Sequence, residues 1–257
     1  MRVLVTNDDG VGSEGLWALA RRVVAAGHEV VVAAPMVDMT GMGAAIGGEL
    51  GNDEMRYERV DRSDLGSACC FAVDGPPALC VILTQLGAFG DPVQLVASGV
   101  NPGMNAGRST LHSGTVGAVM TAVNNGAHGI AVSQDHLAAG HPADEFHWDT
   151  ATHLVPEIIE RVAAVDKGRR AVNVNAPNVP LDRIDGVATT SLAKWGDAAG
   201  VLEHLEEGKL RFVRQPGARA PIPGTDHAAV REGQIAVAEL IGFRVADSDL
   251  ELDGLTV

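Results

Sequence analysis

The sequence contains few aromatic residues, few cysteines and little positive charge. Phe, Trp and Tyr together make up 4% of the 257 residues, whereas glycine is abundant at 31 residues. Of the three cysteines, two are neighbours, and none has the paired spacing of zinc ligands: they are Cys69, Cys70 and Cys80. We therefore interpret them as reduced thiols and expect a cytoplasmic protein.

Positive charge is scarce. The chain has 19 basic and 33 acidic residues, a formal net charge of −14, which disfavours binding to nucleic acid polymers and anionic membranes. No apolar run approaches the ~18 residues of a membrane span, and the acidic N-terminal segment is not typical of a signal peptide. An anionic substrate would need a site whose potential is locally reversed by a metal ion or by helix N-termini.

The first 35 residues predict a βαβ unit. Arg2–Thr6 is a short apolar strand, apolar residues then recur at helical spacing over 16–24, and Gly27 ends that helix. A second apolar strand, Glu29–Pro35, follows, so the two strands should be parallel with a right-handed crossover.

The alternation continues to about residue 180 and predicts an α/β fold with a Rossmann-like, doubly wound sheet. The expected elements are strands at 93–98, 129–133 and 171–175 and helices at 115–125 and 151–165. Beyond Pro180 the pattern changes to strands that we expect to be antiparallel, at 183–192, 209–215 and 234–240. We therefore expect a core over 1–180 that carries the site. A C-terminal segment over 181–257 should contain an arm or hairpin within 194–224 and a last strand that returns to the core.

Three loops that follow predicted strands are rich in small residues and oxygen-bearing side chains: 7–10, 35–43 and 99–117. In open α/β sheets such loops meet at the carboxyl edge, where ligands bind. The first loop places Asp8 beside Asp9, and two adjacent carboxylates repel each other and are costly to bury. The pair could be a solvated turn, could be salt-bridged, for example to Arg108, or could hold a metal ion.

The donor types in these loops favour a hard cation such as Mg²⁺ or Mn²⁺, which prefers oxygen ligands. Ser113, Gly114 and Thr115 open a predicted helix, whose N-terminus is suited to phosphate, although Ser113 could be only an N-cap. Asn101 and Asn105 could likewise be ordinary loop residues. The histidines within 135–149 are interpreted as part of a solvated loop: His136, His141 and His147. A cation beside a phosphate cradle indicates phosphoryl chemistry.

Two stretches carry a resemblance to a known family. Residues 5–20 read VTNDDGVGSEGLWALA, and residues 98–122 read SGVNPGMNAGRSTLHSGTVGAVMTA. Together they resemble the SurE family of survival-protein phosphatases. Shorter matches are DGPPALCV at 74–81, VNVNAPNVP at 172–180 and GTDHAAVREG at 224–233, so that the resemblance spans most of the chain.

The resemblance implies a metal-dependent nucleotidase that hydrolyses nucleoside monophosphates to nucleoside and phosphate by a metal-activated water. It implies one divalent metal ion per subunit, Mg or Mn, held by four side chains: Asp8, Asp9, Thr40 and Asn101. It implies a phosphate pocket lined by four residues: Asn105, Ser113, Gly114 and Thr115. The catalytic residues would be Asp8, Asp9, Asn105 and Ser113. It also implies an arm exchanged between protomers in a homodimer or homotetramer.

The chain departs from the family pattern in four places. Thr40 stands where Ser is usual, His112 where an aromatic residue is usual and Thr121 where Glu is usual, and the loop over 41–60 differs strongly. These changes affect the expected substrate preference more than the metal site. An alternative function is therefore a non-catalytic nucleotide- or phosphate-binding protein on the same fold.

An aspartyl-phosphate enzyme of the haloacid-dehalogenase type is a weaker alternative. That chemistry needs two aspartates separated by one residue after the first strand, together with a downstream lysine. Here Asp8 and Asp9 are adjacent, and no lysine precedes Lys167.

Overall fold

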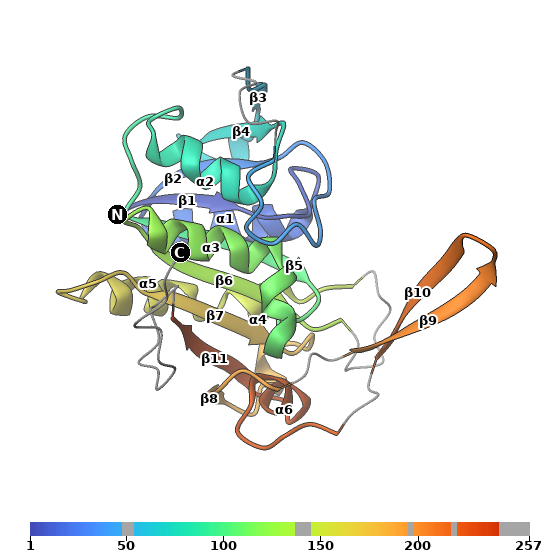
Figure 1. Cartoon of the computed structure of the whole chain (residues 1–257). Helices are drawn as coiled ribbons and strands as arrows, with labels where there is room; N and C mark the ends of the chain where they lie inside the picture. Colours follow the sequence, from blue (N-terminus) through green and yellow to red (C-terminus); the bar gives the residue numbers. More distant parts are fainter. Residues whose placement is uncertain (48–53, 137–144, 195–197, 217–219, 242–257) are drawn as a thin grey trace, which may run out of the picture.

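A computed structural model describes residues 1–47, 54–136, 145–194, 198–216 and 220–241. Its central strands are β1 (Arg2–Thr6), β2 (Glu29–Pro35), β3 (Tyr57–Val60), β4 (Cys69–Val73), β5 (Leu95–Pro102), β6 (His128–Gln134), β7 (Ala171–Ala176), β8 (Val187–Thr189) and β11 (Ile235–Leu240). They form one nine-stranded sheet in the order β3-β4-β2-β1-β5-β6-β7-β11-β8 (Figure 1). The helices are α1 (Glu14–Ala25), α2 (Pro77–Gln85), α3 (Gly114–Asn124), α4 (Trp148–Thr152), α5 (Val155–Ala163) and α6 (Asp226–Arg231).

The middle of the sheet is parallel, from β4 through β2, β1, β5 and β6 to β7. This confirms the Rossmann-like α/β fold, including the βαβ unit of the first 35 residues. At the two sides, β3 runs antiparallel to β4 and β11 runs antiparallel to β7. The prediction of an antiparallel strand over 183–192 is wrong, since β8 is three residues long and pairs parallel with β11. The connection between these two strands includes α6, and such a crossover makes neighbouring strands parallel.

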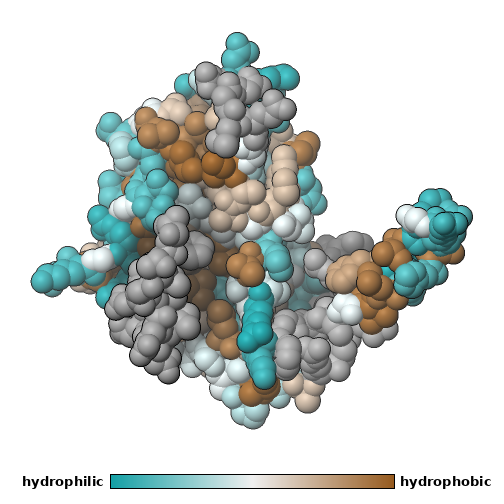
Figure 2. Space-filling view, viewed as in Figure 1, coloured by the Kyte–Doolittle hydropathy of each residue, from teal (hydrophilic) through white to brown (hydrophobic). Residues whose placement is uncertain are grey.

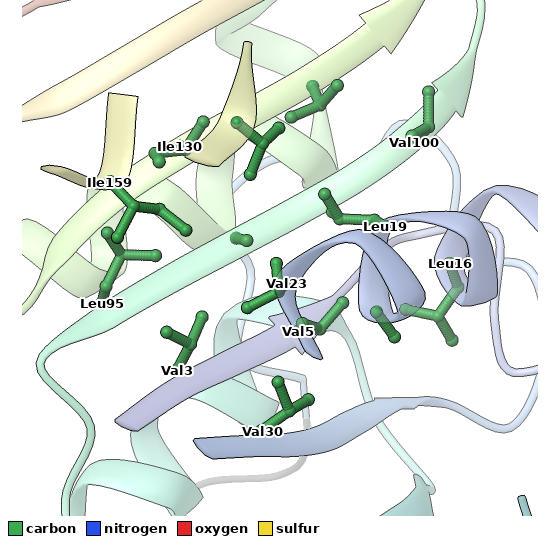
Figure 3. Close-up of a cluster of buried hydrophobic side chains, with 14 of the residues drawn as sticks. Val3, Val5, Leu16, Leu19, Val23, Val30, Leu95, Val100, Ile130 and Ile159 are labelled. Carbon is green, nitrogen blue, oxygen red and sulfur yellow. The ribbon is translucent and has the colours of Figure 1, made fainter. Parts of the chain in front are cut away.

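Alternating side chains of the strands enter two cores on opposite faces of the sheet. Val3 and Val5 pack with residues of α1 and α5, whereas Leu4 packs with residues of α2 and α3. Figure 3 shows the first of these cores, in which Leu16 and Leu19 of α1 face the sheet. Helices on both faces leave the ends of the parallel strands as the place where loops gather.

The helix predicted over 151–165 is two helices, α4 and α5. Pro156 lies in the first turn of α5 and has no N–H to bond the last turn of α4. Proline is favourable at this position of a new helix, so one residue ends the first helix and helps to begin the second. β3, β4 and α2 were not predicted as elements.

The predicted arm is a hairpin of β9 (Ala198–Glu206) and β10 (Lys209–Pro216), which pair antiparallel as a separate two-stranded sheet. It projects away from the main body (Figure 1), and Figure 2 shows apolar side chains along it. We call the segments where it leaves and returns, Ser191–Ala193 and Gly224–Asp226, the arm root. They are joined by a bridge between Ser191 and Thr225 and by a hydrogen bond from the Asp226 N–H to the Ser191 carbonyl over 2.9 Å.

Within the described residues, no helix has both the length and the apolar character needed to cross a membrane.

Candidate functional site

The loop after β1 is a tight turn closed by Asn7. Its side chain accepts a hydrogen bond from the Gly10 N–H and donates one to the Gly10 carbonyl, both over 3.1 Å. Gly10 has a φ of +86°, and a Cβ there would lie 3.1 Å from the carbonyl oxygen of Pro35. The turn therefore needs glycine, and it fixes Asp8 and Asp9 at the carboxyl edge of the parallel strands.

Asp8 is bound to the beginning of α3. Its Oδ1 accepts a hydrogen bond from Thr115 Oγ1 over 2.6 Å, and its Oδ2 accepts one from the Gly114 N–H over 3.1 Å. Asp8 is only 2% exposed, so the solvated-turn interpretation is wrong for this residue. Burial raises the pKa of Asp8, while the hydrogen bonds from Thr115 and Gly114 oppose that rise.

Asp9 lacks such support. Burial, together with the neighbouring charges of Asp8 and Asp38, raises its pKa to about 7. Its Oδ2 is buried and has no hydrogen-bond partner among the described residues. A buried carboxylate oxygen without a donor is costly, and a cation or a proton would relieve it.

The loop after β2 lies against the same turn. The Met39 N–H donates to the carbonyl oxygen of Asp8 over 2.7 Å. The Thr40 N–H and Oγ1 both donate to Asp38 Oδ1, over 2.7 and 2.6 Å. Because the hydroxyl proton of Thr40 points to Asp38, the lone pairs of its oxygen are left to accept.

The loop after β5 carries the two predicted asparagines. Asn101 donates from Nδ2 to the Gly103 carbonyl over 2.6 Å. The side chain of Asn105 donates from Nδ2 to Ser133 Oγ over 2.9 Å, and Asn105 is 9% exposed. Both amides are therefore fixed in orientation at this edge of the sheet.

Two asparagines of β7 hold the main chain of Asn105. Its N–H donates to Asn175 Oδ1 over 2.9 Å, and its carbonyl accepts from Asn173 Nδ2 over 2.8 Å and from Asn175 Nδ2 over 3.1 Å. No role was predicted for Asn173 or Asn175. Their signal in the sequence is an i, i+2 pair, which places both side chains on one face of a buried strand.

Ser113 is the N-cap of α3. Its Oγ accepts a hydrogen bond from the Val116 N–H over 3.1 Å, and the residue is 7% exposed. The N-cap interpretation is therefore confirmed, and it leaves the hydroxyl proton as a possible donor. A Cβ on the following Gly114 would lie 2.7 Å from Asp8 Cβ, so only glycine allows the helix to approach Asp8 this closely.

Of the other titratable groups of the sequence analysis, His136 lies beside the loop after β5, since a Cβ on Gly103 would lie 3.4 Å from its Nδ1 and 3.6 Å from Asn101 Nδ2. The three cysteines are free, and burial raises the pKa of Cys80 to about 12. His136 is exposed, as expected for a solvated loop. His147 is half-buried directly before α4, so the solvated interpretation is wrong there, and His141 lies outside the described residues.

Comparisons by sequence and by structure both relate this chain to one family of known proteins. The family model described as Survival protein SurE matches residues 3–198. The chain is 33% identical over 244 residues to the 5′-nucleotidase SurE of Stenotrophomonas maltophilia strain R551-3, which covers 93% of this chain and 89% of that protein. It is 35% identical over 243 residues to the 5′-nucleotidase SurE of Marinobacter nauticus, covering 92% and 88%.

The crystal structure of the SurE protein from Aquifex aeolicus superposes with a TM-score of 0.74 and 27% identity, covering 93% of each chain. The fold and the relatives agree over nearly the whole length of the chain. This protein therefore belongs to the SurE family.

Proposed function

We propose that this protein is a metal-dependent phosphomonoesterase that hydrolyses nucleoside monophosphates to nucleoside and phosphate. Its family membership, with relatives named 5′-nucleotidase SurE, supports a nucleotidase or phosphatase. The observation on which the proposal chiefly rests is the buried Oδ2 of Asp9, which has no hydrogen-bond donor among the described residues and lies next to the charge of Asp8.

The residues at this edge fit a hard divalent cation. Among the described residues, no three His, Cys, Asp or Glu side chains are placed to hold a metal ion together, so the holder would be a mixed set of oxygen donors. Such a set is typical of Mg²⁺ and Mn²⁺. We assign that role to Asp8, Asp9, Thr40 and Asn101. When bound, the cation would neutralise phosphoryl charge and make a water molecule more acidic.

The chain's own residues have three tasks in the reaction. Asp8 or Asp9 accepts the proton of the attacking water. Ser113 and Asn105 bind and orient the phosphoryl group, together with the N-terminal turn of α3 at Gly114 and Thr115. Asp8 is held against the beginning of α3 by Thr115 and Gly114, whose hydrogen bonds favour its ionised form.

The site also explains how a chain of net charge −14 can bind an anion. The N-terminus of α3 points at the site, and a cation held by the two aspartates would reverse the local potential. A cytoplasmic location, and a homodimer or homotetramer formed through the arm, remain predictions.

The decisive experiment measures phosphate release from a panel of 5′- and 3′-nucleoside monophosphates with Mg²⁺, with Mn²⁺ and with a chelator. We compare the wild type with Asp9→Asn, and use Asp182→Asn, an exposed carboxylate, as the matched control. Metal-dependent release that is lost only in Asp9→Asn supports the proposal.

The alternative is a nucleotide- or phosphate-binding protein without catalysis. It would be favoured if the wild type bound Mn²⁺ and nucleotide but released no phosphate from any member of the panel.

A further inference from the structure

The loop that carries Asn105 is held from two sides. On one side, Asn173 and Asn175 of β7 bind its main chain, as described above. On the other side, the N–H of Gly107 donates to Oδ2 of Asp226 over 2.7 Å. Gly107 lies two residues after Asn105, so both anchors act on the same short segment.

Asp226 is the first residue of α6 and is 1% exposed. Besides Gly107, its carboxylate binds two further main-chain donors through Oδ1: the N–H of Ala193 over 2.9 Å and the N–H of His227 over 2.8 Å. An amide side chain in the same place could not accept all these bonds, because its nitrogen is a donor. The three bonds therefore need the carboxylate.

The same carboxylate connects the candidate site to the arm. Ala193 belongs to the arm root, and the Asp226 N–H closes that root by donating to Ser191. Met104, which directly precedes Asn105 in the loop, packs against Ala229 and Val230 of α6. The loop, the helix and the arm root thus form one packed unit, with the charge of Asp226 inside it.

We propose that Asp226 is a positioning residue of the candidate site, which holds residues 105–107 from the arm root so that Asn105 meets the phosphoryl group of the substrate. The expected effect on KM and Ki rests on the proposed function. Asp226 acts through Gly107 and Asn105 and does not itself touch substrate. Displacement of a binding group by about 1 Å is enough to change affinity and rate strongly.

The test compares Asp226→Asn with Glu232→Gln, the same change of carboxylate to amide on an exposed side chain at the end of the same helix. We expect KM for a nucleoside monophosphate and Ki for inorganic phosphate to rise together by about tenfold in Asp226→Asn and to stay unchanged in Glu232→Gln. A loss of folded molecules alone would lower kcat and leave KM and Ki as they are. Wild-type KM and Ki in folded Asp226→Asn would overturn the proposal.

Amide hydrogen exchange of the wild type is a second test, and it requires neither enzymatic activity nor a variant. In the wild type, we expect the amide protons of Gly107 and Ala193 to exchange with solvent far more slowly than unprotected amides, because both are bonded to a buried carboxylate. Exchange of either amide at the unprotected rate would overturn the proposal even if Asp226→Asn fails to fold. If the wild type releases no phosphate from any substrate, the proposed function fails, and the exchange rates still decide whether Asp226 holds the loop.

Discussion

Thr115 and Asp8 are 107 residues apart in the sequence and are joined by a buried hydrogen bond of 2.6 Å from the threonine Oγ1 to the aspartate Oδ1. This bond ties the first turn of the chain to the first turn of α3. It also favours the ionised form of Asp8 against the burial that raises its pKa. The ionisation of the site therefore depends on a helix supplied by a distant part of the sequence.

Replacing Thr115 by valine removes that donor with little change in volume. We expect a loss of about 1–3 kcal/mol in the free energy of unfolding, since a buried carboxylate oxygen loses a partner. Phosphate release should fall as well, because Asp8 becomes harder to ionise. Urea unfolding and phosphate assays check both effects. The control is Thr121→Val, whose hydroxyl donates to the Gly117 carbonyl within the same helix. Equal effects of the two substitutions would contradict the assigned role of Thr115.

Gly114→Ala tests the close approach of α3 to Asp8. The new Cβ would lie 2.7 Å from Asp8 Cβ and 2.8 Å from its Oδ2, so either the helix or the carboxylate must move. We expect destabilisation of about 1–3 kcal/mol, as for overpacked cores, and loss of most activity. Gly12→Ala has open space around its Cβ and should behave like the wild type in the same melting and activity measurements. An active, stable Gly114→Ala protein would show that the contact can be relaxed.

The raised pKa of Asp9 predicts how stability depends on pH in the absence of metal. The folded state keeps the Asp9 proton up to about pH 7, whereas the unfolded chain loses it near 3.8, the ordinary pKa of an aspartate. Between these values the folded state binds more protons, so the free energy of unfolding falls as pH rises, by on the order of 4 kcal/mol in total. Above about pH 7 this contribution is constant.

Asp9→Asn removes that dependence. We expect the variant to be more stable than the wild type at pH 8, with the difference vanishing near pH 4, as measured by urea unfolding in chelator. Adding Mn²⁺ should then stabilise the wild type and have little effect on the variant. A wild-type protein whose stability relative to the variant did not change from pH 4 to pH 8 would contradict the raised pKa.

The predicted homodimer or homotetramer should form through the arm. Leu202 and Phe212 are directly opposite each other in the hairpin and are 58% and 62% exposed. We expect Leu202→Ser combined with Phe212→Ser to weaken self-association in sedimentation velocity, since exposed apolar pairs of this kind are typical of contact surfaces. Arg211→Ser, a polar change on the neighbouring residue of the same strand, is the control. A monomeric wild type would refute the prediction.

Much of the fold could be predicted because its strands and helices have strong local patterns. Val3–Val5 and the alternation that follows indicate a parallel sheet with helices on both faces, as observed. The division between α4 and α5 could have been predicted from Pro156 alone. The short edge strand β8 could not, because its direction depends on its pairing with β11, which is 48 residues later in the chain when Val187 and Ile235 are compared.

The residues of the candidate site likewise include some that could be predicted from the sequence and some that could not. Asp8, Asp9 and Ser113 stand out because adjacent carboxylates and a helix N-cap are local patterns. Asp226 does not, because it binds a main-chain group far away in the sequence: Gly107 is separated from Asp226 by 119 residues. Long-range hydrogen bonds to main-chain atoms leave no periodic trace in the sequence.

The closed arm root has an evolutionary consequence. Because the chain leaves and returns through Ser191 and Thr225, which are bridged to each other, residues can be added to or removed from the hairpin without shifting the register of β11. The length of the hairpin can thus change among descendants while the candidate site keeps its geometry. For the protein engineer, the turn at Gly208 is accordingly a natural point for inserting a peptide tag.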